Sequence, residues 1–234
     1  MLKSHAPSCL EGIVLGTLSV NLAAAMIAKP LTTLLSAFIV FAFAGCAAWN
    51  KYDLRQTKVI APSGSTSVAV ACVDERVALR QGDVAPELIG VTRSGFGVPY
   101  RVKTATKVPI AKEIAEAVVR GFGSKRKLAP AMFFKDSGSA RAALQGTGTD
   151  RQILILIERY NSDTLIRTEL DYSIKMEVYD GTGRLLAAAS RTKIADLGGN
   201  AFFPAMHAHH SVIRTTGEVL NDLLSSPEMR GALQ

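Results

Sequence analysis

The chain has 234 residues, which is the length of one domain or at most two small ones. It is 48% hydrophobic with three cysteines, a composition that excludes an intrinsically disordered chain, a collagen-like chain and a disulfide-dense scaffold. The formal net charge of +7 is mild for this length and does not indicate nucleic-acid binding, so no nucleic-acid partner is expected.

An uncharged apolar stretch occupies residues 31–44 and follows Lys29 and Pro30. It is too short to cross a bilayer core of about 30 Å, which needs about 20 residues. A short apolar run behind a basic residue and before small residues is typical of a secretory signal peptide. The sequence therefore predicts a leader over residues 1–45.

Two features upstream of this stretch bear on how the leader is organised. Residues 13–25 form a second apolar patch, which leaves a two-helix membrane anchor as an alternative. Met26, however, begins a complete leader by itself, so we consider it a candidate for the true start.

The end of the leader, Phe43-Ala44-Gly45-Cys46, resembles the lipobox at which bacterial lipoproteins are cleaved. Cleavage between Gly45 and Cys46 would leave a cysteine that carries fatty acyl chains such as palmitate. Phe43 stands where leucine is usual, and an ordinary signal peptide or a buried Cys46 is the alternative. Ala47, rather than aspartate, follows Cys46, which favours the outer membrane. We predict a lipid-anchored protein of the bacterial outer membrane that faces the periplasm.

The chain after the leader divides into two parts. Residues 46–67 comprise the lipidated cysteine and a polar stretch rich in turn-forming residues, which predicts a flexible tether. Residues 68–234 are expected to form a single α+β domain. Cys72 is then the one cysteine of that domain, and its apolar neighbours predict a buried side chain rather than a nucleophile.

Hydrophobic patterning predicts strands and helices along this domain. Strands are expected at residues 67–73, 87–92, 98–106, 153–157, 170–178 and 185–194, and an apolar piece lies at 131–134. Helices are expected at residues 109–121, at 139–144, from about 206 onward and, as a last short turn, from 226. From this order we predict a mostly antiparallel sheet with two main helices packed on one face.

Several of these features together resemble the YajG-like family of bacterial lipoproteins. They are the lipobox at Cys46, a strand that ends in Asp74 and Arg76, the pair Ile89-Gly90, one amphipathic helix, a three-strand meander and a C-terminal amphipathic helix. The resemblance covers about residues 68–224. It implies a location and a fold, and it implies no reaction and no catalytic residues.

Candidate chemical sites are few. His207, His209 and His210 form a dense histidine cluster, in which two residues spaced three apart would share a helix face and could bind zinc or copper. A solvated helix start is the alternative. Asp74 and Arg76 are expected to form a surface ion pair worth less than about 1 kcal/mol, with a binding role as the alternative. We find no nucleophile elbow and no converging carboxylates, and we expect neither enzymatic activity nor a cofactor.

The remaining candidate functional residues are ones that could contact a partner at the surface. Candidate residues for contact with an envelope partner or lipid are Arg93, Arg101, Lys103, Lys107, Phe202 and Phe203. The leading hypothesis is a non-enzymatic binding or scaffold module of the bacterial envelope, anchored in the membrane through Cys46. One alternative is an accessory lipoprotein subunit of an envelope transport or assembly complex. The other is a metal-binding protein or hydrolase that uses the histidine cluster.

Overall fold

The structure is a computed structural model that describes residues 51–123 and 126–234. The chain divides into two compact units at residues 48 and 49, and the described residues all belong to the second unit. The predicted leader, with Gly45 and Cys46, lies outside the described residues. Within the described ranges, no helix is both long enough and apolar enough to cross a membrane.

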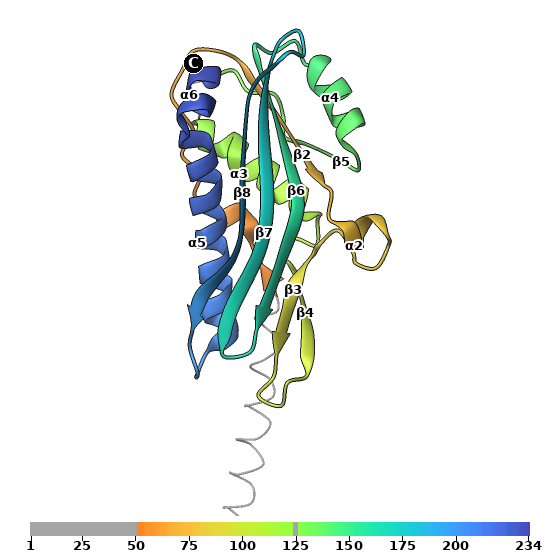
Figure 1. The fold of residues 1–234 in the computed structure, drawn as a ribbon, viewed down its shortest axis with the longest axis vertical. Coiled ribbons are helices and arrows are strands. Elements are labelled where there is room, and N and C mark those ends of the chain that lie inside the picture. Colours follow the sequence, from red (N-terminus) through yellow and green to blue (C-terminus); the bar gives the residue numbers. More distant parts are fainter. Residues whose placement is uncertain (1–50, 124–125) are drawn as a thin grey trace, which may run out of the picture. The chain divides into compact units, whose positions relative to one another are not determined.

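The described chain alternates strands with short and long helices (Figure 1). The strands are β1 (Lys51–Tyr52), β2 (Val68–Asp74), β3 (Leu88–Arg93), β4 (Pro99–Thr104), β5 (Met132–Phe134), β6 (Arg151–Thr164), β7 (Arg167–Asp180) and β8 (Leu185–Gly199). The helices are the 3-10 turn η1 (Leu54–Gln56) and α2 (Val77–Arg80), α3 (Ile110–Phe122), α4 (Ser137–Gln145), α5 (Pro204–Ser225) and α6 (Pro227–Leu233).

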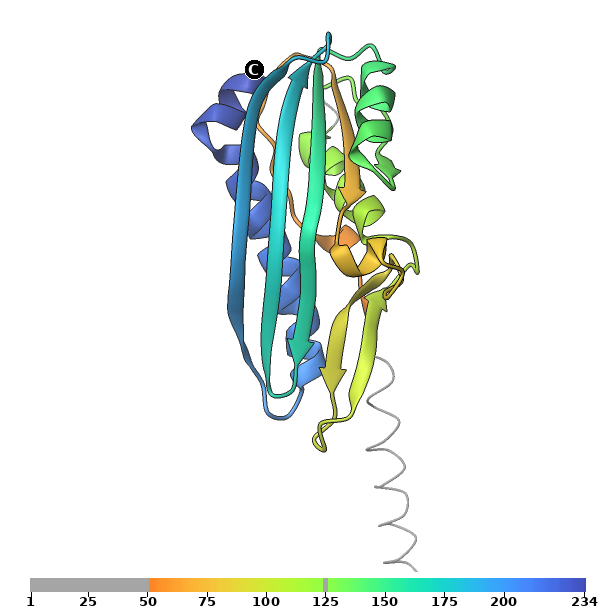
Figure 2. The ribbon, with the colours of Figure 1, turned by 45° about the vertical axis from the view of Figure 1, so that its right-hand side comes forward.

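All eight strands belong to one mixed sheet, in which β6 is the pivot. One edge of β6 pairs in parallel with β2 along its first half, up to Asp74 opposite Ile157, and in parallel with β3 from Ser162 onward. The other edge pairs with β7, which pairs with β8, both antiparallel. The sheet is completed by the antiparallel β3–β4 hairpin, by β5 parallel to β2 and by β1 parallel to β4 (Figure 2).

The predicted fold class is therefore wrong in two respects. Four of the seven strand pairings in the described residues are parallel, whereas a mostly antiparallel sheet was expected. Helices also lie on both faces of the sheet, since α4 covers the face opposite α3 and α5. The burial of β2 along its whole length agrees with both differences, because a strand covered on both faces is typical of parallel pairing.

The core is divided by the sheet into two clusters. The larger cluster includes Val70, Ile155 and Ile174 on the sheet and packs against α3, α5 and α6. The smaller one joins Ala71 and Leu154, on the opposite face, to Ala140 and Leu144 of α4. The alternating side chains of β2 and β6 thus contribute to both clusters, because successive residues of a strand point to opposite faces.

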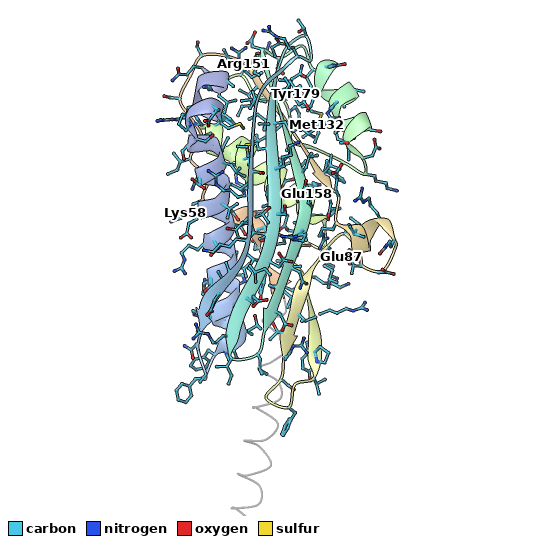
Figure 3. All side chains as sticks on the ribbon, in the orientation of Figure 1. Lys58, Glu87, Met132, Arg151, Glu158 and Tyr179 are labelled. Atoms are coloured by element: carbon cyan, nitrogen blue, oxygen red, sulfur yellow. The ribbon has the colours of Figure 1, made fainter. Side chains whose placement is uncertain are left out.

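The folded unit takes in residues that the sequence analysis assigns to the tether. Tyr52 and Leu54 are fully buried, and the Leu54 N–H donates to Oε2 of the buried Glu113 on α3 at 2.9 Å. Further along, the Asn221 side chain of α5 holds this segment through the Ile60 N–H at 2.7 Å and the Lys58 carbonyl at 3.0 Å. We call residues 51–61 the strap; Lys58 lies along it, on the α5 side of the sheet in Figure 3.

Candidate functional site

Asp74 and Arg76 do not form the expected surface ion pair; they are buried where the sheet changes from β2 to β3. Their side chains are 5% and 8% exposed, and the Arg76 guanidinium donates to the Asp74 carboxylate at 2.8 Å through both Nε and Nη2. Arg76 Nη1 also donates to the carbonyl of Leu88 at 2.6 Å and that of Tyr160 at 3.3 Å. The pair therefore has a structural task in the sheet and is not available as a surface contact.

Four strand ends meet at one end of the sheet. The register places Thr92 of β3 opposite Thr164 of β6, Thr164 opposite Thr168 of β7, and Arg167 opposite Gly199 of β8. Three connections must therefore lie together: the β3–β4 turn, the β6–β7 turn and the β8–α5 loop. Figures 1 and 2 show all three at the lower end of the sheet. The close approach of Gly199 to the Ile166 carbonyl joins two of them directly.

These connections carry exposed apolar side chains. Phe96 in the β3–β4 turn is 94% exposed, and Phe202 in the β8–α5 loop is 87% exposed. The others are more than two-fifths exposed: Val98, Leu165, Ile166 and Phe203. We call these six side chains the apolar end. Soluble domains seldom gather exposed aromatic and aliphatic side chains in this way unless the surface contacts a partner or a membrane.

Two exposed ion pairs link the strands next to the apolar end. Arg93 of β3 pairs with Asp163 of β6 at 2.6 Å, and Arg167 of β7 pairs with Asp196 of β8 at 2.5 Å. Arg167 lowers the pKa of Asp196 below its ordinary value, mainly through this hydrogen bond, so the carboxyl stays ionised. The pairs tie β3 to β6 and β7 to β8 just behind the exposed side chains.

The structure separates the basic residues that the sequence analysis grouped together. Arg93 is neutralised by Asp163, and Lys103 pairs with Glu87 at 2.9 Å. Lys107 follows β4 at the end of that strand remote from the β3–β4 turn. Arg101 is exposed on β4, close to the apolar end, and has no ion pair among the described residues. The surface is therefore apolar with little free positive charge.

Phe202 and Phe203 belong to the apolar end, and the structure adds four exposed apolar residues to them: Phe96, Val98, Leu165 and Ile166. The sequence offers one signal for the last two. Leu165 and Ile166 form an apolar pair in the two-residue turn between β6 and β7, where turn-forming polar residues are usual. What the sequence could not show is that the three loops share one end, because that depends on the strand register.

The histidine rings do not converge on one point: those of His207 and His209 contact different backbone carbonyls, and His210 lies edge-on to His209 with ring centres 5.1 Å apart. The His207 ring lies 3.1 Å from the Leu197 carbonyl, and the His209 ring lies 3.1 Å from the Lys51 carbonyl. Burial lowers the pKa of His209 below its ordinary value, which favours the neutral ring. Residues 51–123 and 126–234 contain no group of three His, Cys, Asp or Glu residues placed to hold a metal ion.

Cys72 is fully buried in β2 as a free thiol, as its apolar neighbours predict. Burial raises the pKa of this thiol well above its ordinary value, so it is not an activated nucleophile. Gly45 and Cys46, the predicted cleavage and lipidation residues, precede the described part of the chain.

Comparison with known proteins gives distant structural similarities. No family model matches the chain, and no curated protein matches it. The crystal structure of protein XCC0632 from Xanthomonas campestris, of family DUF330, aligns with a TM-score of 0.49 and 15% identity, over 75% of this chain and 94% of that one. Lipoprotein GNA1162 from Neisseria meningitidis aligns with a TM-score of 0.28 and 15% identity, over 63% of this chain and 95% of that one. At these values the similarities establish neither the family nor the function of this chain.

Proposed function

We propose that this chain is a lipid-anchored protein of the bacterial outer membrane, similar to YajG-like lipoproteins, whose domain is a non-enzymatic binding module seated on the bilayer by its apolar end. The lipobox at Cys46 supports the anchor. The six exposed side chains of the apolar end support the seating. The observation that joins the two is the short distance along the chain between Cys46 and the folded unit.

The chain length between Cys46 and Lys51 limits how far the domain can stand from the membrane. Five residues span at most about 18 Å when fully extended. Lys51 pairs with Lys103, four residues along β4 from Pro99 at the β3–β4 turn. Four strand residues rise about 13 Å, so an anchor at Cys46 can reach the level of the apolar end.

The opposite end of the sheet is out of reach of the same anchor. Lys103 pairs with Leu88, and Arg76 Nη1 binds the carbonyls of Leu88 and Tyr160, so Lys51 lies near the level of Tyr160. The opposite end, at Arg151, is nine residues before Tyr160 on β6, or about 30 Å away. Figure 3 labels Arg151 at that end. An acylated Cys46 therefore favours the apolar end as the one that meets the bilayer. In addition, β1 is parallel to β4, so the chain enters the fold from the side of the apolar end.

The energies are consistent with a contact that assists the anchor and does not replace it. Burial of a phenylalanine side chain contributes about 1.5–3 kcal/mol, so three of them give a moderate affinity at most. Acyl chains on Cys46 would supply the stable attachment, because stable anchoring needs more than one such chain. Once the domain is tethered, the apolar end meets a high local concentration of lipid.

The anchor is tested with a Cys46→Ala variant expressed from the full-length gene in bacteria. The variant is expected to lose incorporation of labelled palmitate and to migrate as the uncleaved precursor, because the acylated cysteine is also the cleavage site. Cys9→Ala is the matched control and should incorporate palmitate like the unaltered chain. If Cys46→Ala keeps both palmitate and mobility, the chain is not a lipoprotein anchored at this residue.

A further inference from the structure

A groove lies beside α2, well away from the apolar end. Its volume is about 800 Å³, within the usual range of small-molecule sites.

 The cavity between β8 and α5 is about half as large, at about 410 Å³. The walls of the groove come from α2 and the loop that follows, from the first turn of α3, and from the ends of β2 and β5. We call it the α2 groove; its lining residues on these elements include Leu79, Arg80, Val84, Pro109, Phe133 and Lys135.

The lining of the α2 groove is mostly apolar. Leu79 and Val84 contribute aliphatic side chains from the α2 side, and Pro109 closes the end next to α3. Phe133 lies on β5, a three-residue strand that pairs only with β2 in the described sheet, and it is 45% exposed. A large aromatic side chain is thus left half in water at the wall of a cavity, where an apolar ligand would cover it.

Charge distinguishes this groove from an ordinary apolar depression. Arg80 of α2 and Lys135, which follows β5, both line it, and neither has a side-chain hydrogen bond or an ion pair in the described part of the chain. Lys112 Nζ lies 5.8 Å from the centre of the Phe133 ring and adds a third positive charge nearby. Asp74 is the one carboxylate of the lining, and Arg76 already neutralises it. Among the lining side chains, the charge without an ion-pair partner is therefore positive.

We propose that the α2 groove binds a small amphiphile that has an apolar body and an anionic head group. The apolar body covers Phe133 and contacts Leu79 and Val84, while the head group, a carboxylate or a phosphate, pairs with Arg80 and Lys135. Guanidinium and ammonium groups suit such a head group because charge-assisted hydrogen bonds to oxygen anions are strong. This site does not depend on the membrane contact proposed above.

The proposal is tested by photo-crosslinking of the full-length protein in phosphatidylcholine nanodiscs. The anionic probe is decyl phosphate with a diazirine in its alkyl chain, and the neutral probe is the corresponding alcohol. The anionic probe is expected to label peptides that contain Leu79–Val84 or Phe133, and to do so more strongly than the alcohol. Labelling confined to other peptides, or equal labelling by the alcohol, would overturn the proposal.

Two variants separate the roles of charge and apolar surface. The double variant Arg80→Gln/Lys135→Gln is expected to weaken binding of decyl phosphate about tenfold, because both charge-assisted contacts are lost. Its matched control, Lys127→Gln/Arg230→Gln, changes the net charge equally at two exposed sites outside the groove lining and should bind as before. Phe133→Ser is expected to weaken binding of both probes. Unchanged binding by the first variant, or equal weakening by the control, contradicts the proposal.

Discussion

The Arg76 side chain closes a break in the hydrogen bonding of the sheet. β2 pairs with β6 only up to Ile157, and β3 pairs with it only from Ser162, so the stretch between them lacks a full strand partner on that edge. Arg76 donates to the Tyr160 carbonyl there and to the Leu88 carbonyl at the start of β3. Asp74 balances the charge of Arg76, so a polar junction is buried with its hydrogen bonds made.

Removal of this guanidinium is expected to destabilise the fold. Arg76→Ala leaves the Asp74 carboxylate buried without its partner, and breaking a buried pair in this way typically costs about 3–5 kcal/mol. The free energy of unfolding of the purified protein, measured by urea titration, tests the expectation. Arg184→Ala is the control, because it removes an exposed pair with Asp180 that is worth less than about 1 kcal/mol. If the two variants lose equal free energy of unfolding, the buried pair contributes no more to stability than the exposed pair.

Packing explains the nearby residues Ile89 and Gly90. Ile89 is fully buried in the larger core cluster, and Gly90 follows it on β3. A Cβ atom on Gly90 would lie 2.0 Å from the carbonyl oxygen of Ser162, so only glycine permits β3 to pair with β6 this closely. The sequence features that suggest a resemblance to YajG-like lipoproteins, Asp74, Arg76 and Ile89-Gly90, are thus adjacent in the structure.

At the scale of elements, local patterning predicts most strands and helices to within a few residues. The helix expected at residues 109–121 is α3, Ile110–Phe122, and the alternating strand at 170–178 lies within β7. These elements follow from periodic apolar residues, which are visible locally. The parallel pairing of β2 with β6 joins segments about 80 residues apart. Its one local sign is that both segments are continuously buried, so local patterning does not predict the pairing.

The strap was missed for a different reason. Residues 62–67 have the composition of a mobile linker, and this masks the burial of Tyr52 and Leu54 just before them. Two glycines leave room for the strap, because a Cβ atom on Gly121 of α3 or on Gly217 of α5 would lie within 3 Å of it. Glycine in a helix costs stability relative to alanine, so its presence here marks a close backbone approach.

Gly121→Ala is therefore expected to loosen the strap even though alanine favours helix. The new Cβ would lie 2.7 Å from Val59 Cγ1 and 2.9 Å from the Val59 carbonyl oxygen. Trypsin should then cut after Lys58 several times faster than in the unaltered protein, as followed by mass spectrometry. Gly231→Ala in α6 is the control, because its Cβ meets nothing within 4 Å, and cleavage should be unchanged. An unchanged rate in Gly121→Ala would mean that the strap is not held by this contact.

At the scale of the whole domain, the long strands β6, β7 and β8 separate two ends with different surfaces. The apolar end gathers Phe96, Ile166 and Phe202 from three loops, and the other end carries the β7–β8 turn. In that turn Asp180 accepts hydrogen bonds from Thr182 and Arg184, which is a polar arrangement suited to water. Only the first of these ends lies within reach of an anchor at Cys46.

The most direct test of this account compares the surroundings of the two ends in the membrane. An environment-sensitive NBD label is attached to Phe96→Cys at the apolar end or, as the matched control, to Leu185→Cys at the other end, where Leu185 is 50% exposed. The background is low, because Cys72 is fully buried and Cys46 would be acylated. In vesicles we expect blue-shifted emission and quenching by nitroxide lipids at position 96, and water-like emission at position 185. Water-like emission at both positions, or quenching at position 185 alone, would contradict the account.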